Sequence, residues 1–145
     1  MENLKWKSLK LWTSYVSPVL LEELIKRNIL PVFIARRINN STLIGQWEGT
    51  AVHFPELAPS PELLRSWKYH GMPTDEFKKN FWQELNNVRL EKILGRMKTM
   101  ADLTGASGIV MLGYGPNRLE DHRSIVSDYI NQTGLLENPI NELIL

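Results

Sequence analysis

The sequence predicts an α/β fold: a small three-layer, Rossmann-like domain in which a short parallel sheet of three to four strands is flanked by helices. Two near-continuous apolar runs, at residues 29–38 and 109–112, have the pattern of parallel strands buried on both faces. A strand pattern, a helix pattern and a second strand pattern follow one another within residues 9–38. We therefore expect a βαβ unit with a right-handed crossover.

Composition sets bounds on this fold. A chain of 145 residues fits one domain spanning residues 1–145, since a domain of this size buries roughly 68–70% of its unfolded surface. Its 43% hydrophobic and 23% charged residues are ordinary for a soluble protein, and no apolar run approaches the roughly 18 residues of a membrane span. The first twelve residues interleave lysines with apolar residues and lack the core of a secretory signal. We expect a cytoplasmic protein without a membrane partner.

Charge and cysteine content narrow the classes of function. A net charge of +1 provides no global field for nucleic acid, so any anion must be bound locally. The chain has no cysteine, which excludes disulfides, a thiolate nucleophile and thiolate metal ligands. Because His53, His70 and His122 are scattered without ligand spacing, we expect no metal site, and nothing indicates a cofactor.

The first elements are read from pattern and capping. Residues 9–16 alternate apolar and polar side chains, which is typical of a strand. Ser17 then serves as the N-cap of a helix with Pro18 at its first position and an apolar face up to Arg27. The buried strand at residues 29–38 follows.

The middle of the chain is less regular before it becomes helical. Residues 39–59 are rich in Gly and Pro with only a weak strand pattern at 50–54, and so long an irregular run is usually functional or mobile. Ser60 and Pro61 begin a short helix that Gly71 ends. From Pro73 to Gly105 apolar residues recur at helical spacing, which indicates two helices or one kinked helix.

The last part repeats the strand-to-helix order. A strand at residues 108–112 leads through a Gly-rich turn to a helix that opens at Asp121 and ends at Gly134. The tail, residues 135–145, is too apolar to remain in water. We expect it either to dock on its own domain or to pack against a second copy, which would make a homo-oligomer.

Several of these segments resemble a known family. LAPSPELLRSWK at residues 57–68 and EFKKNFWQEL at 76–85 resemble a signature of the YeaO-like proteins, uncharacterised members of the domain of unknown function 488 superfamily. TSY at 13–15, and LGYG at 112–115 with DHR downstream, are similar to the family's strand ends, so the resemblance spans residues 9–130. It implies a small α/β domain with a parallel sheet and a site location, but no activity.

Two departures from the family pattern concern that site. Gly113 and Asp121 stand where relatives have cysteines, which removes sulfur chemistry from both positions. Arg36-Arg37-Ile38 replaces an aromatic-Pro pair at the second strand end, a change that can alter ligand preference.

The candidate site is the carboxyl edge of the sheet. Ligands of open parallel sheets bind there, and helix N-termini offer free N–H groups and positive dipole to an anion. The catalytic candidates are Asp121 and His122. The ligand-binding candidates are the polar and aromatic residues after the strands: Thr13, Ser14, Tyr15, Arg36, Arg37, Trp47, Tyr114, Arg118 and Arg123.

The arginines, Asp121 and His122 can each be explained by a structural role as well as by a functional one. Asp121 is a good N-cap, whereas His122 can transfer a proton and the planar fork of Arg123 suits phosphate or carboxylate. Arg36 and Arg37 point to opposite faces, so at most one reaches a ligand, and the other forms a surface ion pair of about 0–1 kcal/mol. An Arg beside Arg123 with no fixed carboxylate partner would favour an anionic ligand.

Each of the remaining candidates also has a ligand-binding and a structural interpretation. The hydroxyls of residues 13–15 can bind phosphate or ribose, or cap the next helix. Tyr114 can stack on a base or close the turn, and Arg118 occupies the third glycine position of a dinucleotide-binding turn, which weakens that motif. Trp47, in the irregular segment, is a candidate lid over the ligand, while most other aromatic residues fit the core.

These observations favour a small-molecule binding protein over an enzyme. We expect it to hold a phosphorylated or nucleotide-like anion, sequestering or sensing it, because beyond Ser14 and Thr13 there is no side-chain nucleophile. The first alternative is a hydrolase of a nucleotide-type substrate that uses His122 and Asp121. The second is a protein–protein interaction module that acts through the C-terminal tail.

Overall fold

The computed structural model describes residues 5–15, 17–35, 52–113 and 122–144. Within them a parallel sheet has five strands in the order β3-β2-β4-β1-β5. The strands are β1 (Leu11–Tyr15), β2 (Ile29–Phe33), β3 (Val52–His53), β4 (Gly108–Gly113) and β5 (Asn141–Glu142). The predicted α/β class is confirmed. The sheet exceeds the expected three to four strands because the C-terminal tail contributes β5.

Five α-helices and two short 3-10 helices accompany the strands in the described residues. They are η1 (Lys5–Ser8), α1 (Pro18–Arg27), η2 (Pro55–Leu57), α3 (Pro61–Tyr69), α4 (Thr74–Leu85), α5 (Leu90–Thr104) and α6 (Arg123–Thr133). The long helical pattern after Pro73 is therefore two helices. Gly105 and Gly134 end α5 and α6 in the left-handed conformation, with φ of 71° and 69°.

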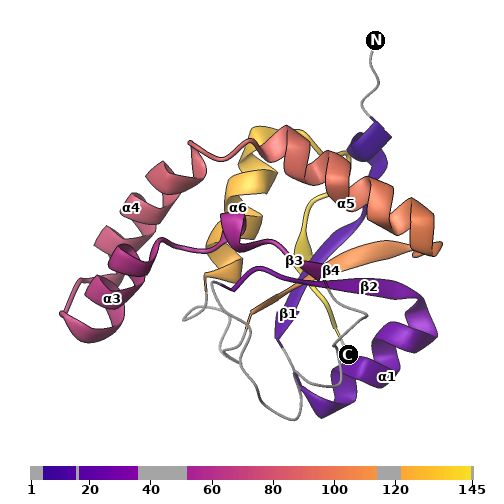
Figure 1. The fold of residues 1–145 in the computed structure, drawn as a ribbon, viewed down its shortest axis with the longest axis horizontal. Coiled ribbons are helices and arrows are strands. Elements are labelled where there is room, and N and C mark those ends of the chain that lie inside the picture. The colour runs from indigo at the N-terminus through magenta and orange to yellow at the C-terminus, as the bar shows by residue number, and fades with distance from the viewer. Residues whose placement is uncertain (1–4, 16, 36–51, 114–121, 145) are drawn as a thin grey trace.

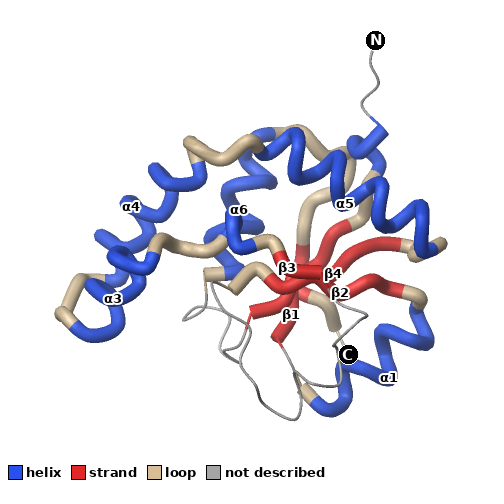
Figure 2. Tube along the Cα trace, in the orientation of Figure 1, coloured by secondary structure: helices blue, strands red, loops and turns tan. Residues whose placement is uncertain are grey.

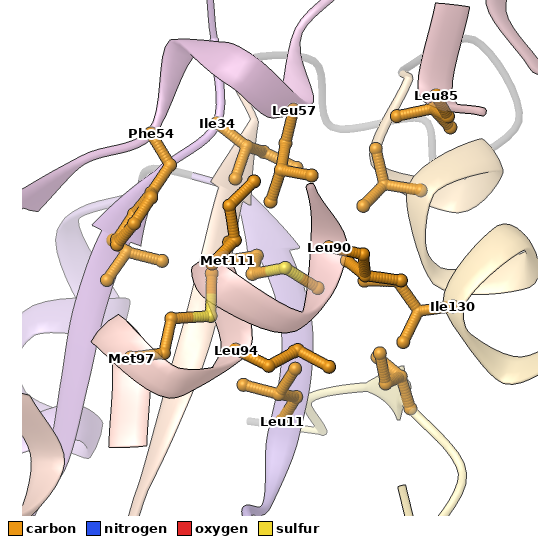
Figure 3. Close-up of a cluster of buried hydrophobic side chains, with 14 of the residues drawn as sticks. Leu11, Ile34, Phe54, Leu57, Leu85, Leu90, Leu94, Met97, Met111 and Ile130 are labelled. Carbon is orange, nitrogen blue, oxygen red and sulfur yellow. The ribbon is translucent and has the colours of Figure 1, made fainter. Parts of the chain in front are cut away.

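Helices cover both faces of the sheet (Figures 1 and 2). On one face, Leu20 and Leu24 of α1 pack in a cluster with Val110 and Leu112 of β4. On the other, α5 and α6 share the main core with Ile109 and Met111, the alternate residues of the same strand. Figure 3 shows part of this main core, where α5 side chains meet β1, β4 and the segment around η2. The predicted three-layer arrangement is confirmed.

Helices α3 and α4 form a hairpin at one end of the molecule (Figure 1). Trp67 and Phe77 stack between the two helices with ring centroids 4.0 Å apart. Trp82 of α4 packs edge-on against Tyr129 of α6 at 4.9 Å, which fixes the hairpin to the main body.

The amino edge of the sheet is closed by side chains that bond to backbone. Asn28 Nδ2 donates to the carbonyl of Gly105 at 2.6 Å, and Ser107 Oγ donates to the carbonyl of Arg27 at 2.8 Å. Gly108 has no room for a side chain, since a Cβ there would lie 2.6 Å from the Trp12 ring. This edge is scaffold.

The apolar tail docks on its own domain. Ile140 and Leu143 are buried, and the Leu143 N–H donates to the Thr13 carbonyl at 2.8 Å. Asn131 of α6 bonds both the N–H and the carbonyl of Ile140. Of the two expectations for the tail, docking on its own domain is therefore the one observed. In the part of the chain that the structure describes, no helix is both long and apolar enough to span a membrane.

Candidate ligand-binding site

The connections between strands place a topological switch point between β1 and β4. From β1 the chain passes through α1 to β2 in one direction across the sheet, and from β4 it passes through α6 to β5 in the other. Right-handed crossovers in opposite directions require helices on opposite faces, as observed for α1 and α6. Ligands of open α/β sheets bind outside the carboxyl ends of strands at such a point. Here those ends are Tyr15 and Gly113, which are paired in register.

The two helices that begin at this edge have no acidic residue in their first turns. Acidic residues lie in the first turns of α3 (Glu62), α4 (Asp75 and Glu76) and α5 (Glu91), where they stabilise the positive end of the helix. The first turns of α1 and α6 contain none. The positive end of α1 is therefore not compensated by an acid in its own first turn.

On the α6 side, the charged and polar side chains are bonded to one another. The guanidinium of Arg123, which is 0% exposed, donates to Glu142 of β5 through Nη2 at 2.8 Å and through Nε at 3.2 and 3.3 Å. Thr13 Oγ1 donates to the same carboxylate at 2.6 Å. The Tyr15 ring lies 5.6 Å from the guanidinium carbon of Arg123.

This network makes Arg123 part of the scaffold. A buried guanidinium without a partner is strongly unfavourable, and Glu142 neutralises it. Arg123 therefore has a fixed carboxylate partner, and its contact with an anionic ligand stays a prediction. Glu142 was not predicted as a site residue. The signal that could have found it is an acidic residue between Ile140 and Leu143, the buried residues of the apolar tail.

His122, at the N-cap position of α6, is also bonded. Its Nε2 lies 2.6 Å from the carbonyl oxygen of Ile34, just after β2, and its ring meets Phe81 edge-on at 6.0 Å. Because a carbonyl only accepts, Nε2 carries a hydrogen, and proton transfer by a neutral His122 would use Nδ1. His53 Nε2 makes the same contact with the next carbonyl, that of Ala35, at 2.6 Å.

On the α1 side lie two serine side chains, Ser14 and Ser17. Ser14 is 2% exposed. Ser17 is the N-cap of α1, as predicted, but its side chain makes no cap bond. Its Oγ is buried without a hydrogen-bond partner.

The structure brings some of the predicted residues together. Thr13, Tyr15 and Arg123 meet on the α6 side, His122 precedes Arg123 at the start of α6, and Ser14 lies on the opposite face of β1. Six candidates lie outside the described residues: Arg36, Arg37, Trp47, Tyr114, Arg118 and Asp121.

The described residues line open hollows between α3 and α4, beside α5 and α6, and along α5, all away from the predicted site residues. The hollow between α3 and α4 is lined mainly by polar side chains, among them Glu62, Asn80 and Glu84. Within the described ranges no three His, Asp or Glu side chains are grouped so as to hold a metal ion.

Comparison with known proteins identifies a family. The model of DUF488-N3a, described as the active DUF488-N3 subclade, matches residues 29–134, which cover β2 through α6. Comparisons with curated proteins and with solved structures gave no match.

Proposed function

The chain belongs to the DUF488 family, and we propose that it is a cytoplasmic protein that binds a small phosphorylated or nucleotide-like anion, sequestering or sensing it. The ligand lies outside the carboxyl ends of β1 and β4. The observation that carries this proposal is the switch point there, on which two helices without an acid in the first turn begin.

The side chains around this point support an anion more than an apolar ligand. Ser14 and Ser17 offer hydroxyls, and the amino end of α1 offers backbone N–H groups. Arg123 remains bonded to Glu142 when the ligand is present. We therefore assign it, with Thr13, the role of shaping the site rather than of binding the anion alone. Arg36 or Arg37 remains the proposed cationic contact.

A hydrolase of a nucleotide-type substrate is the second candidate. The matching subclade is described as active, and His122 lies at the start of α6 on the same edge. In this version His122 acts as acid or base through Nδ1, with Asp121 orienting it. The third candidate, protein–protein interaction through the tail, has less support, because Ile140 and Leu143 are buried in the chain's own domain. Of the apolar tail residues, Ile144 is 81% exposed and available to a partner.

Amide chemical shifts test the proposed site directly. Titrating the 15N-labelled protein with AMP, ADP and glucose 6-phosphate should shift the amides of Ser14, Tyr15, Ser17 and Gly113. The built-in control is the amino edge, where the amide of Ser107 should not move. Shifts confined to the amino edge, or no binding across the panel, would overturn the proposal.

Recovering the ligand separates binding from catalysis. After incubation with AMP or ADP, mass spectrometry of intact nucleotide supports sequestration, whereas product formation supports the hydrolase. Any turnover should be lost in His122→Ala and in His122→Gln, because Gln keeps a donor for the Ile34 carbonyl but no acid–base group. Full turnover in His122→Gln would contradict the role assigned to His122.

A further inference from the structure

Two helices of this protein begin with the same dipeptide but use it differently. In α3, the Oγ of Ser60 accepts the N–H of Leu63 at 3.2 Å and donates to Glu84 at 2.5 Å. In α1, Ser17 precedes Pro18 as Ser60 precedes Pro61, yet its φ of −149° differs from the −61° of Ser60. The N–H of Leu20 bonds the backbone carbonyl of Ser17 instead, at 3.2 Å, and the Ser17 hydroxyl bonds nothing.

An unbonded buried hydroxyl is a costly feature. Native proteins satisfy nearly all buried polar atoms, because an unpaired one loses its hydrogen bonds to water and gains none. The Ser17 Oγ is the buried side-chain atom without a partner in the part of the chain that the structure describes. Its missing partner is therefore external to the described residues.

Ser14 places a second hydroxyl on the same side. Successive strand residues point to opposite faces, and Thr13 points to Glu142 on the α6 side. Ser14 therefore points to the α1 side, as does Trp12, which packs in the α1 cluster. Ser14 is 2% exposed.

From these placements, and on the basis of the function proposed above, we infer that the ligand's phosphoryl group lies at the amino end of α1. The hydroxyls of Ser14 and Ser17 donate to its oxygens, together with the N–H of Val19, the first in the helix after Pro18. No acidic side chain occupies the first turn of α1. On the opposite side, Glu142 already neutralises Arg123, and we therefore assign the phosphoryl group to the α1 side.

The test compares AMP with adenosine, which differ only in the phosphoryl group. By isothermal titration calorimetry, Ser17→Ala and Ser14→Ala should each weaken AMP binding on the order of tenfold, and the double variant more. Adenosine binding should not change. Ser17→Thr retains the hydroxyl and should bind AMP like the wild type, while the matched control, Ser60→Ala, should also leave AMP affinity unchanged.

The outcomes separate this inference from the proposed function. If the wild type binds AMP and the double variant binds it equally well, the phosphoryl subsite is wrong although the ligand site stands. Equal losses of AMP and adenosine would likewise overturn the subsite. If the wild type binds no phosphorylated compound of the panel, both proposals fail. Melting curves of each variant establish that affinity is measured on folded protein.

Discussion

Two sides of one strand end differ in how their polar groups are satisfied. Toward α6, Thr13, Arg123 and Glu142 bond to one another. Toward α1, the hydroxyl of Ser17 has no hydrogen-bond partner among the described residues. Both sides flank the same switch point, so topology alone does not tell them apart.

The difference separates a side whose polar groups stabilise the fold from a side where we propose that the ligand binds. The bonded side contributes to stability, because a buried guanidinium, a carboxylate and a hydroxyl satisfy one another there. The buried, unbonded Ser17 hydroxyl costs stability, and a protein retains such a group where an external group completes its bonds. The comparison predicts that substitutions on the α6 side change the free energy of unfolding and that those on the α1 side change ligand affinity.

The largest effect should come from Glu142→Gln. The change removes the charge that neutralises buried Arg123, and breaking a buried ion pair costs about 3–5 kcal/mol. Because the Glu142 side chain is 29% exposed, we expect the lower end, about 3 kcal/mol of unfolding free energy in urea titrations.

A matched control is Glu137→Gln in the same tail. Glu137 is exposed, and its structural bond is made by its backbone N–H to the Lys7 carbonyl. The expected change is within about 0.5 kcal/mol. If both variants were destabilised equally, the loss would come from removing a negative charge from the tail, and the Arg123–Glu142 ion pair would add nothing to the free energy of unfolding.

The sequence predicts the elements of this fold well because their signals are local. The α1 start at Ser17-Pro18 and the left-handed end of α5 at Gly105 depend on neighbouring residues alone, and the structure has both. The spacing of hydrophobic residues likewise predicted β4 and the helices before and after it, α5 and α6.

What the sequence did not predict is long-range pairing. Thr13 and Glu142 are 129 positions apart, and they meet only because β5 joins β1 in register. A two-residue strand has too short a pattern to be recognised from alternation. Without β5, the partner of Arg123 could not be predicted, and Ser17 was predicted to be an ordinary N-cap.

A smaller loss should follow from Ser60→Ala. The substitution removes the cap bond to the Leu63 N–H and the hydroxyl that donates to Glu84. Loss of a serine cap typically costs about 0.5–2 kcal/mol, and we expect about 1–2 kcal/mol because two bonds are lost. Urea unfolding of the variant measures it, and an unchanged midpoint would mean that Ser60 caps α3 no better than alanine does.

The smallest change, and one of opposite sign, should follow from Ser17→Ala without ligand. The wild-type hydroxyl is buried and makes no bond, so removing it leaves no donor or acceptor unsatisfied and relieves an unpaired polar atom. We expect the free energy of unfolding to rise by no more than about 0.5 kcal/mol. The same experiment in saturating AMP should reverse the order, since the wild type gains more stability from a ligand that it binds more tightly. A Ser17→Ala variant destabilised as much as Ser60→Ala would show that the two Ser-Pro starts are equivalent caps, and the distinction between the two sides of β1 would be lost.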